Sequence, residues 1–236
     1  MLKKETIKLI SSDNPSFMDI LSISVGKVFV FEERLKDHIG NYAHINALFK
    51  QGELYLDDKL YLVQFMGSTS PEDNCWFSSE IEKVIPDYYK TTMVETRKTM
   101  ERMNYKELME KKIPLHDDVN GDTLAIIYTA FAEEDTAYFC GVNNISLYMY
   151  IDALPDKIFE KITSSTFCVT VPQIISKYSV NHKIMVKALL IENDIEYEEQ
   201  GNNIVAKFRN GENSDVNVLF DDLGRIKRVE GSLKKQ

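Results

Sequence analysis

The sequence lacks a long uninterrupted hydrophobic run. Its longest apolar stretches, residues 20–31 and 124–131, are interrupted by Ser, Gly, Lys or Thr, whereas a membrane-spanning helix needs about 20 predominantly apolar residues. The chain starts with Met-Leu-Lys-Lys, but charged residues from Glu5 onward break up the apolar segment that a signal peptide requires. We therefore expect no membrane helix, no cleaved leader and a cytoplasmic location.

Cysteine is scarce. The three cysteines, Cys75, Cys140 and Cys168, are an odd number separated by long gaps. A disulfide framework or a zinc ribbon would show an even set or paired C-x-x-C spacings. We expect all three thiols to be reduced and buried.

Motifs for metals, cofactors and nucleophiles are also missing. No G-x-G-x-x-G, G-x-x-x-x-G-K-[ST] or G-x-S-x-G pattern occurs. The histidines lack the H-E-x-x-H spacing of a zinc helix and have no Cys pair within ligand spacing: they are His38, His44, His116 and His182. We predict no catalytic residue, no metal and no cofactor.

Two acidic clusters and one glycine turn are weaker candidates. Asp117 with Asp118, and residues 133–135, could hold a cation or supply acid and base carboxylates. Both clusters lie at the ends of expected elements, where solvated charge is the usual role. The turn at 67–70 could offer backbone donors to an anion, but Glu72 and Asp73 would repel one.

Positive charge is in deficit, since 37 acidic residues face 28 basic ones and the net charge is −9. Nucleic-acid binding depends on clustered Lys and Arg that neutralise phosphates, so a nucleic-acid partner is not expected. A basic protein partner would suit this charge. The same charge also keeps a protein in solution without any partner.

Helical periodicity predicts several helices. The longest is expected over 16–47, with Leu21, Val25, Val28, Leu35, Ile39 and Tyr42 in one apolar stripe. Glu32 fills a gap in this stripe, where a carboxylate is more typically at the edge and in contact with solvent than a buried functional acid. Further helices are expected over 86–112, 122–133, 155–162 and 182–193, and Pro172 is expected to begin another helical turn.

Alternating residues and turn signals predict strands over 53–56, 60–66, 75–81, 137–142, 145–151, 196–199, 204–208, 216–220 and 225–230. Turns are expected at Asp57 with Asp58, and at Asn143 with Asn144. The fold class is therefore α+β: an antiparallel sheet packed with long helices, followed by a small unit of one helix and an antiparallel meander. We assign domains to 1–160 and 161–236, and a single domain stays open as an alternative.

Short motifs resemble a family of uncharacterised bacterial proteins. They are a Gly-Ser turn at Gly67 and Ser68, a strand that starts with Trp76, the pair Tyr138 and Phe139, the helix start at 178–182, and the segment 221–225 before the last strand. Family members often repeat Trp along that strand, whereas this chain has Ser78 and Glu80 at the alternate positions. The resemblance implies a bacterial cytoplasmic α+β protein and no particular reaction.

The expected strand 75–81 contains the first candidate binding residues. Trp76, Ser78 and Glu80 point to one face, and the more apolar set on the other face is expected to contact the core: Cys75, Phe77, Ser79 and Ile81. Trp76, Ser78 and Glu80 would then form a partly exposed binding surface. Alternatively, Trp76 anchors the helix from Pro86 against the sheet.

Tyr148 and Tyr150, which share one face of a strand, complete the candidate set. Tyrosine is enriched where proteins bind proteins, although a sheet core with hydroxyls at its rim explains both residues equally well.

The sequence favours a non-enzymatic binding protein whose partner is another protein. Its most concrete form is an immunity protein that neutralises a basic toxin. The alternatives are a small-molecule-binding protein or enzyme with a pocket between the sheet and the long helices, and a structural partner in a larger assembly.

Overall fold

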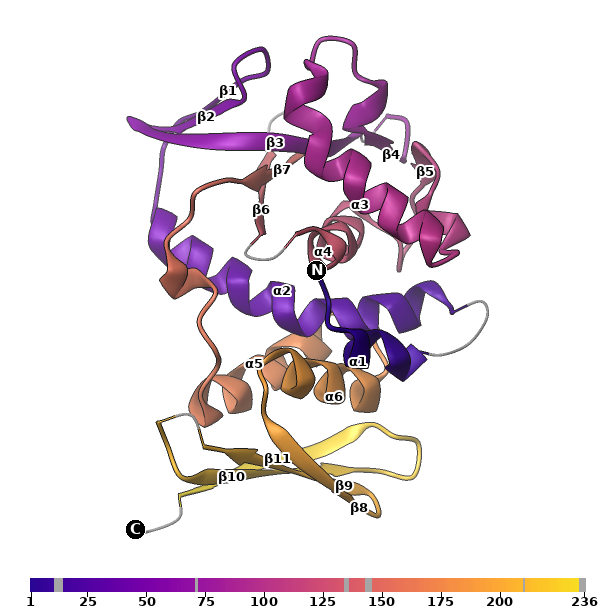
Figure 1. Cartoon of the computed structure of the whole chain (residues 1–236), viewed down its shortest axis with the longest axis vertical. Helices are drawn as coiled ribbons and strands as arrows, with labels where there is room; N and C mark the ends of the chain where they lie inside the picture. The colour runs from indigo at the N-terminus through magenta and orange to yellow at the C-terminus, as the bar shows by residue number, and fades with distance from the viewer. Residues whose placement is uncertain (11–14, 71, 134–135, 143–145, 210, 234–236) are drawn as a thin grey trace. The chain divides into compact units, whose positions relative to one another are not determined.

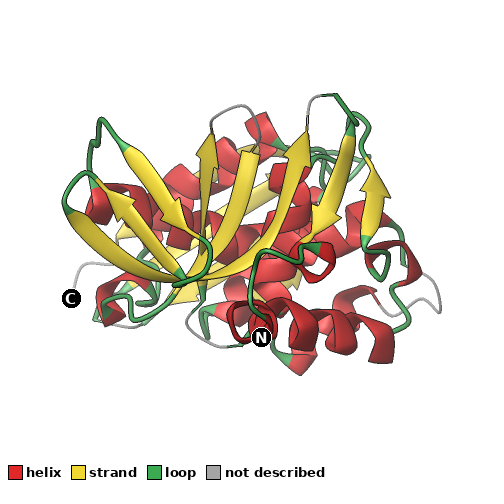
Figure 2. Ribbon diagram, turned by 90° about the horizontal axis from the view of Figure 1, so that it is seen from above, coloured by secondary structure: helices red, strands yellow, loops and turns green. Residues whose placement is uncertain are grey.

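A computed structural model describes residues 1–10, 15–70, 72–133, 136–142, 146–209 and 211–233. The chain forms two compact units, one of residues 31–159 with Met1, the other of residues 2–30 and 160–236. Each unit combines helices with antiparallel strands, which confirms the α+β class. Figure 2 shows the helices in red and the strands in yellow.

The first unit is built on one antiparallel sheet. Its strands are β1 (Ile45–Leu48), β2 (Glu53–Leu56), β3 (Lys59–Ser70), β4 (Cys75–Ser78), β5 (Lys112–Pro114), β6 (Ala137–Val142) and β7 (Ser146–Ile151). Among the described residues β1 to β5 pair in sequence order, β7 also pairs with β3, and β6 pairs with β7. Helices α3 (Thr91–Arg102) and α4 (Gly121–Phe131) contact β3, the long strand of Figure 1.

Gly67 lets β3 pass beneath a large aromatic ring. A Cβ atom at this position would collide with the indole of Trp76 and would lie 2.6 Å from the carbonyl oxygen of Phe77. The register of β3 against β7 shifts between Phe65 and Gly67, as it does at a β-bulge. The absent side chain and the bulge together allow Trp76 to pack across the strand.

Helix α4 begins with a reciprocal cap. The Asn120 side chain accepts a hydrogen bond from the Thr123 amide at 3.0 Å, and the Thr123 hydroxyl accepts one from the Asn120 amide at 3.0 Å. Such a capping box satisfies two amides that the helix leaves without partners. The apolar repeat after it confirms the helix expected over 122–133.

The second unit packs helices on a four-stranded meander. Its elements are α1 (Lys4–Ile7), α5 (Ser164–Lys177), α6 (His182–Glu192), β8 (Glu196–Gln200), β9 (Asn203–Phe208), β10 (Ser214–Phe220) and β11 (Ile226–Leu233). The strand order is β11-β10-β9-β8. Alternate residues of β9 and β10 are buried, and α5 contacts β10 and β11. The helix and four strands expected after residue 182 are confirmed.

Helix α2 (Phe17–Ile39) contributes residues to both units. In the second unit its Gly26 lies so close to Leu189 of α6 that a Cβ atom added at residue 26 would be 3.0 Å from the Leu189 Cβ. Its Ser22 hydroxyl accepts a hydrogen bond of 2.8 Å from the Asn181 amide. These contacts group residues 2–30 with the C-terminal part of the chain, whereas the sequence assigned 1–160 to one domain. Element order alone carries no information about such long-range packing.

Three helices differ from their predicted extents. The helix predicted over 16–47 ends at Ile39, because Gly40 adopts φ +72° and its amide bonds the Lys36 carbonyl at 2.8 Å. The helix predicted over 86–112 is α3 alone, and Asn104 at φ +59° follows its end. In the segment 155–162 only a 3₁₀ turn at Asp156–Ile158 forms.

Five further elements were missed or misplaced. Strand β1 replaces the end of an expected helix, β5 begins where another expected helix was to end and was not predicted, and β3 continues to Ser70 through an expected loop. Strand β4 stops at Ser78, whose hydroxyl accepts from the Glu80 amide at 3.4 Å and opens a 3₁₀ turn. Helix α5 encloses Pro172 rather than starting there. The turn predicted at Asn143 and Asn144 lies outside the described residues.

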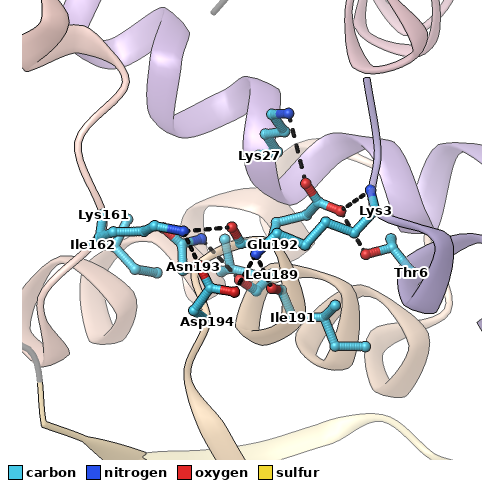
Figure 3. A network of polar contacts seen from close by, with 10 residues as sticks. All are labelled: Lys3, Thr6, Lys27, Lys161, Ile162, Leu189, Ile191, Glu192, Asn193 and Asp194. Carbon is cyan, nitrogen blue, oxygen red and sulfur yellow. Dashed lines mark hydrogen bonds and ion pairs between the residues drawn. The ribbon is translucent and has the colours of Figure 1, made fainter. Parts of the chain in front are cut away.

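A buried carboxylate joins α1 to the end of α6 (Figure 3). Glu192 Oε1 accepts from the Lys3 amide at 2.8 Å and from the Thr6 hydroxyl at 2.5 Å, and Oε2 lies 3.6 Å from Lys27 Nζ. Lys3 Nζ also donates to the Ile191 carbonyl at 3.0 Å. Cations at a helix C-terminus are favourable, so this network both caps α6 and anchors α1.

We predict that Glu192→Ala destabilises the protein by about 3 to 5 kcal/mol, because it removes one member of a buried, hydrogen-bonded charge network. Urea unfolding measures this loss. Glu196→Ala, which removes an exposed carboxylate at the start of β8, should change stability by less than about 0.5 kcal/mol. Equal losses in the two variants would contradict the assigned role of Glu192.

Candidate functional site

The structure buries four of the five residues predicted to form a binding surface. Trp76, Ser78 and Tyr150 are 0% exposed and Tyr148 is 4% exposed. The predicted exposure of this face is therefore wrong. Helix α4 covers this face: its Tyr128 stacks on Trp76 with ring centroids 5.7 Å apart.

In the segment 75–81, the residues expected to face the core are more exposed than Trp76 and Ser78 toward its end. Ile81 is 42% exposed and Phe77 is partly exposed, while Cys75 is buried. Strand alternation stops at Ser78, and the Ser79 hydroxyl turns inward to donate to the Phe65 carbonyl at 2.6 Å. The prediction compared the number of apolar residues on each face. It chose the wrong face because the single large indole ring of Trp76 is buried in place of the other set of side chains.

Glu80 has a structural role in an ion-pair network. Its carboxylate pairs with Arg97 of α3 and, at 3.3 Å, with Lys111. The Glu80 and Arg97 side chains are 13% and 19% exposed. The structure thus places Glu80 beside the same layer of side chains as Trp76 and Tyr128, where it ties α3 to the end of β4.

A second cluster gathers polar side chains that the sequence did not group. Glu32 of α2, Asp122 of α4, Tyr138 and Cys140 of β6, and Tyr148 of β7 interact in the first unit. The Tyr148 hydroxyl donates to Asp122 Oδ1 at 3.2 Å, and the Tyr138 hydroxyl donates to the Glu32 carboxylate. A Cβ atom at the start of α4 would collide with the Tyr148 hydroxyl, so glycine at residue 121 permits this contact.

Burial sets the protonation of this cluster. It raises the pKa of the Glu32 carboxyl to about 7, although the bond from Tyr138 and the charge of Lys36 act in the opposite direction. Asp122 and Glu33 add to the increase through like-charge repulsion. Glu32 is half-buried, which agrees with its expected position at the edge of the apolar stripe, and the bond from Tyr138 makes it a member of the cluster.

The cysteine of the cluster is not activated. Burial and the nearby Asp122 charge raise the pKa of the Cys140 thiol to about 11, and a thiol that keeps its proton at neutral pH is a poor nucleophile. Cys75, Cys140 and Cys168 form no disulfide, and only Cys75 is fully buried. The prediction that all three are buried is wrong for Cys140 and Cys168.

The cluster can hold a proton near neutral pH, which is the property required of a general acid or base. Among the described residues no three His, Cys, Asp or Glu side chains are placed to hold a metal ion. The gap filled by Glu32 in its apolar stripe was the one sequence signal for this cluster. Its other members come from distant elements and follow no motif.

Charge is divided unequally between the two units. Residues 31–159 contain 23 acidic and 13 basic residues, a net charge of −10, whereas residues 2–30 and 160–236 contain 14 acidic and 15 basic residues, a net charge of +1. The acidic character of the chain therefore belongs to the first unit. This unit also exposes large apolar side chains, including Leu60, Leu62 and Tyr88.

Comparison of the chain with protein-family models, with curated proteins and with solved structures gives no match. No helix within the described part of the chain combines the length and apolarity needed to cross a membrane. Functional inference therefore depends on the geometry and charge of the chain itself.

We predict that Trp76→Ala destabilises the protein by about 3 to 5 kcal/mol, because it removes a fully buried ring and leaves a cavity between Tyr128 and Tyr148. Thermal unfolding of the variant beside the parent measures the loss. Tyr88→Ala, at a residue that is 78% exposed, is the matched aromatic control and should leave the midpoint nearly unchanged. An unchanged midpoint for Trp76→Ala would disprove its role in the core.

We predict that Glu32→Gln stabilises the protein at pH 8 and loses this advantage toward pH 5. The folded-state pKa of about 7 lies above the ordinary glutamate value of 4.5, so the folded state resists ionisation of Glu32. The stability from the protonated carboxyl is complete below pH 4.5 and is lost as the pH rises through 7. The gain at pH 8 should be on the order of 2 to 3 kcal/mol.

Urea unfolding at several pH values measures this difference. Glu33→Gln is the neighbouring control, since its side chain is 45% exposed, and it should shift stability by less than about 1 kcal/mol at each pH. Parallel pH profiles for Glu32→Gln and the parent would refute the assignment.

Proposed function

We propose that this chain is a non-enzymatic binding protein whose partner is a basic protein. The observation that carries the proposal is the net charge of −10 on residues 31–159 beside +1 on the rest of the chain. A concentrated field of one sign steers an oppositely charged partner and accelerates association. The raised thiol pKa of Cys140 offers no nucleophile that would favour covalent catalysis instead.

The most concrete form of this proposal is an immunity protein that neutralises a basic toxin by direct contact. Blocking a basic active surface requires electrostatic complementarity and no chemistry, and an acidic unit is suited to it. The resemblance at Gly67, Ser68 and Trp76 extends the proposal to a bacterial, cytoplasmic protein. Nucleic acid is not the proposed partner, because the acidic unit would repel phosphates.

A small-molecule-binding or enzymatic role is the second candidate. It is favoured by one observation, the Glu32 carboxyl with its pKa near 7 beside Asp122 and Tyr148. Shifted carboxyl pKa values concentrate at functional sites, although structural networks also produce them. The variant Glu32→Gln distinguishes the two candidate functions. Proton transfer in an enzyme requires the Glu32 carboxyl, whereas electrostatic steering of a protein partner does not.

The proposal predicts that co-expression of this chain restores growth to cells that express a toxin encoded beside its gene. With the purified pair, Asp58→Lys combined with Glu82→Lys should slow association by about tenfold at low salt, because both exposed carboxylates belong to the acidic unit. Stopped-flow association rates over a range of ionic strength measure this effect.

The matched control combines Glu5→Lys with Glu196→Lys, which makes the same charge change on exposed residues of the second unit. It should alter the association rate much less. No rescue and no binding by the neighbouring product would reject the immunity role, and equal slowing by both pairs would reject the acidic unit as the binding unit. Loss of rescue in Glu32→Gln alone would favour the second candidate.

A further inference from the structure

Two leucines of β3 lie on the outward face of the first unit's sheet. In the β2–β3 register Tyr55 is opposite Leu60 and Glu53 is opposite Leu62, so the four side chains share one face. Leu54 and Leu56, on the other face, are 0% and 1% exposed. Leu60 and Leu62 keep 49% and 52% of their surface exposed.

Helix cover on this face stops just beyond the two leucines. Gln64, two residues after Leu62 on the same strand, accepts a hydrogen bond from the Thr92 amide at the start of α3 through its Oε1 atom, at 2.9 Å. Figure 1 shows α3 beside the part of β3 that is distant from β1 and β2. The segment of β3 before Gln64 therefore presents its leucines to solvent.

The 3₁₀ turn Asp87–Lys90 packs against the β2–β3 hairpin. The ring of Tyr89 lies directly over Gly52, in the turn that precedes Glu53, and leaves no space there for a Cβ atom. Tyr88 packs edge-on against Tyr89 with ring centroids 5.1 Å apart and is 78% exposed. Tyr88 thus presents a large, accessible ring beside Tyr89.

Carboxylates surround this apolar centre. Glu53 lies directly opposite Leu62 and accepts a hydrogen bond of 3.1 Å from the Tyr55 hydroxyl. Asp58 is exposed in the turn before Leu60, and the Asp87 side chain, next to Tyr88, is fully exposed while it pairs with Lys90 at 2.9 Å. An apolar centre with a charged rim is the usual anatomy of a protein interface.

We propose, resting on the proposed function, that this face docks a segment of the basic partner that presents an apolar side chain flanked by Lys or Arg. We call it the leucine face and define it by Glu53, Tyr55, Leu60 and Leu62. The apolar side chain packs on the two leucines, and the flanking cations approach Glu53 and Asp58. The charge of the unit selects such a partner over an apolar segment without cations.

Selection from a library of random twelve-residue peptides, with the full chain as bait, tests the proposal. The enriched peptides should carry an aliphatic or aromatic residue flanked by Lys or Arg. Leu60→Asn combined with Leu62→Asn should weaken the best synthetic peptide by at least about tenfold in a calorimetric titration, as expected when central apolar contacts are lost. Both leucines are half exposed, so the fold should persist, which circular dichroism verifies.

The control combines Val169→Asn with Leu223→Asn, at residues of the second unit that are 59% and 76% exposed, and it should leave the peptide affinity unchanged. Basic peptides that bind the leucine variant and the parent equally would overturn the leucine face while the proposed function stands. Enriched peptides without cations, or no enrichment, would overturn both. A dimer of the parent in sedimentation equilibrium that the leucine variant abolishes would assign the face to a second copy and overturn the docking proposal.

Discussion

The indole ring of Trp76 occupies the space that a side chain at residue 67 would need. The packing of the first unit depends on this close approach of the ring to the backbone of β3. The ring is held between the phenol rings of Tyr128 and Tyr148, at centroid distances of 5.7 and 5.2 Å. It therefore fixes the distance between α4 and the sheet. A smaller residue at 76 would leave α4 without its main apolar contact, and a larger one at 67 would displace the ring.

The position of α4 in turn determines where polar groups can meet. Because α4 starts at Gly121 against the Tyr148 hydroxyl, Asp122 is within 3.2 Å of that hydroxyl, and Glu32 and Cys140 complete the cluster. A carboxyl that burial holds near neutral pKa costs stability whenever it ionises. The polar cluster is thus a consequence of the packing around Trp76.

Sequence reasoning succeeded where a local signal decides the structure. The helix Gly121–Phe131 follows from its apolar repeat and the meander from residue 196 onward follows from turns and alternation, and both were predicted. Sequence reasoning failed where the surroundings of a residue are determined by an element distant in the chain. Nothing near Trp76 in the sequence shows that α4 covers its face, and nothing near Glu32 shows that Asp122 and Tyr138 approach it. The exposure of Leu60 and Leu62 likewise depends on how much of β3 the helix α3 covers. The pairing register of the strands does not show where that helix lies.

The two units use their charges differently, and this difference bears on where a partner binds. In the second unit many carboxylates are engaged internally, as Glu192 is with α1, Glu199 with Lys183 and Lys187, and Glu198 with Lys207. The first unit has ten more acidic than basic residues, so internal pairing cannot neutralise it. Its excess field extends into solvent, about 8 to 10 Å at physiological salt, and acts on a partner before contact. Electrostatic attraction by the acidic residues accelerates the association of a partner with the apolar face, and burial of that face slows its dissociation. The association rate and the lifetime of the complex therefore depend on different residues.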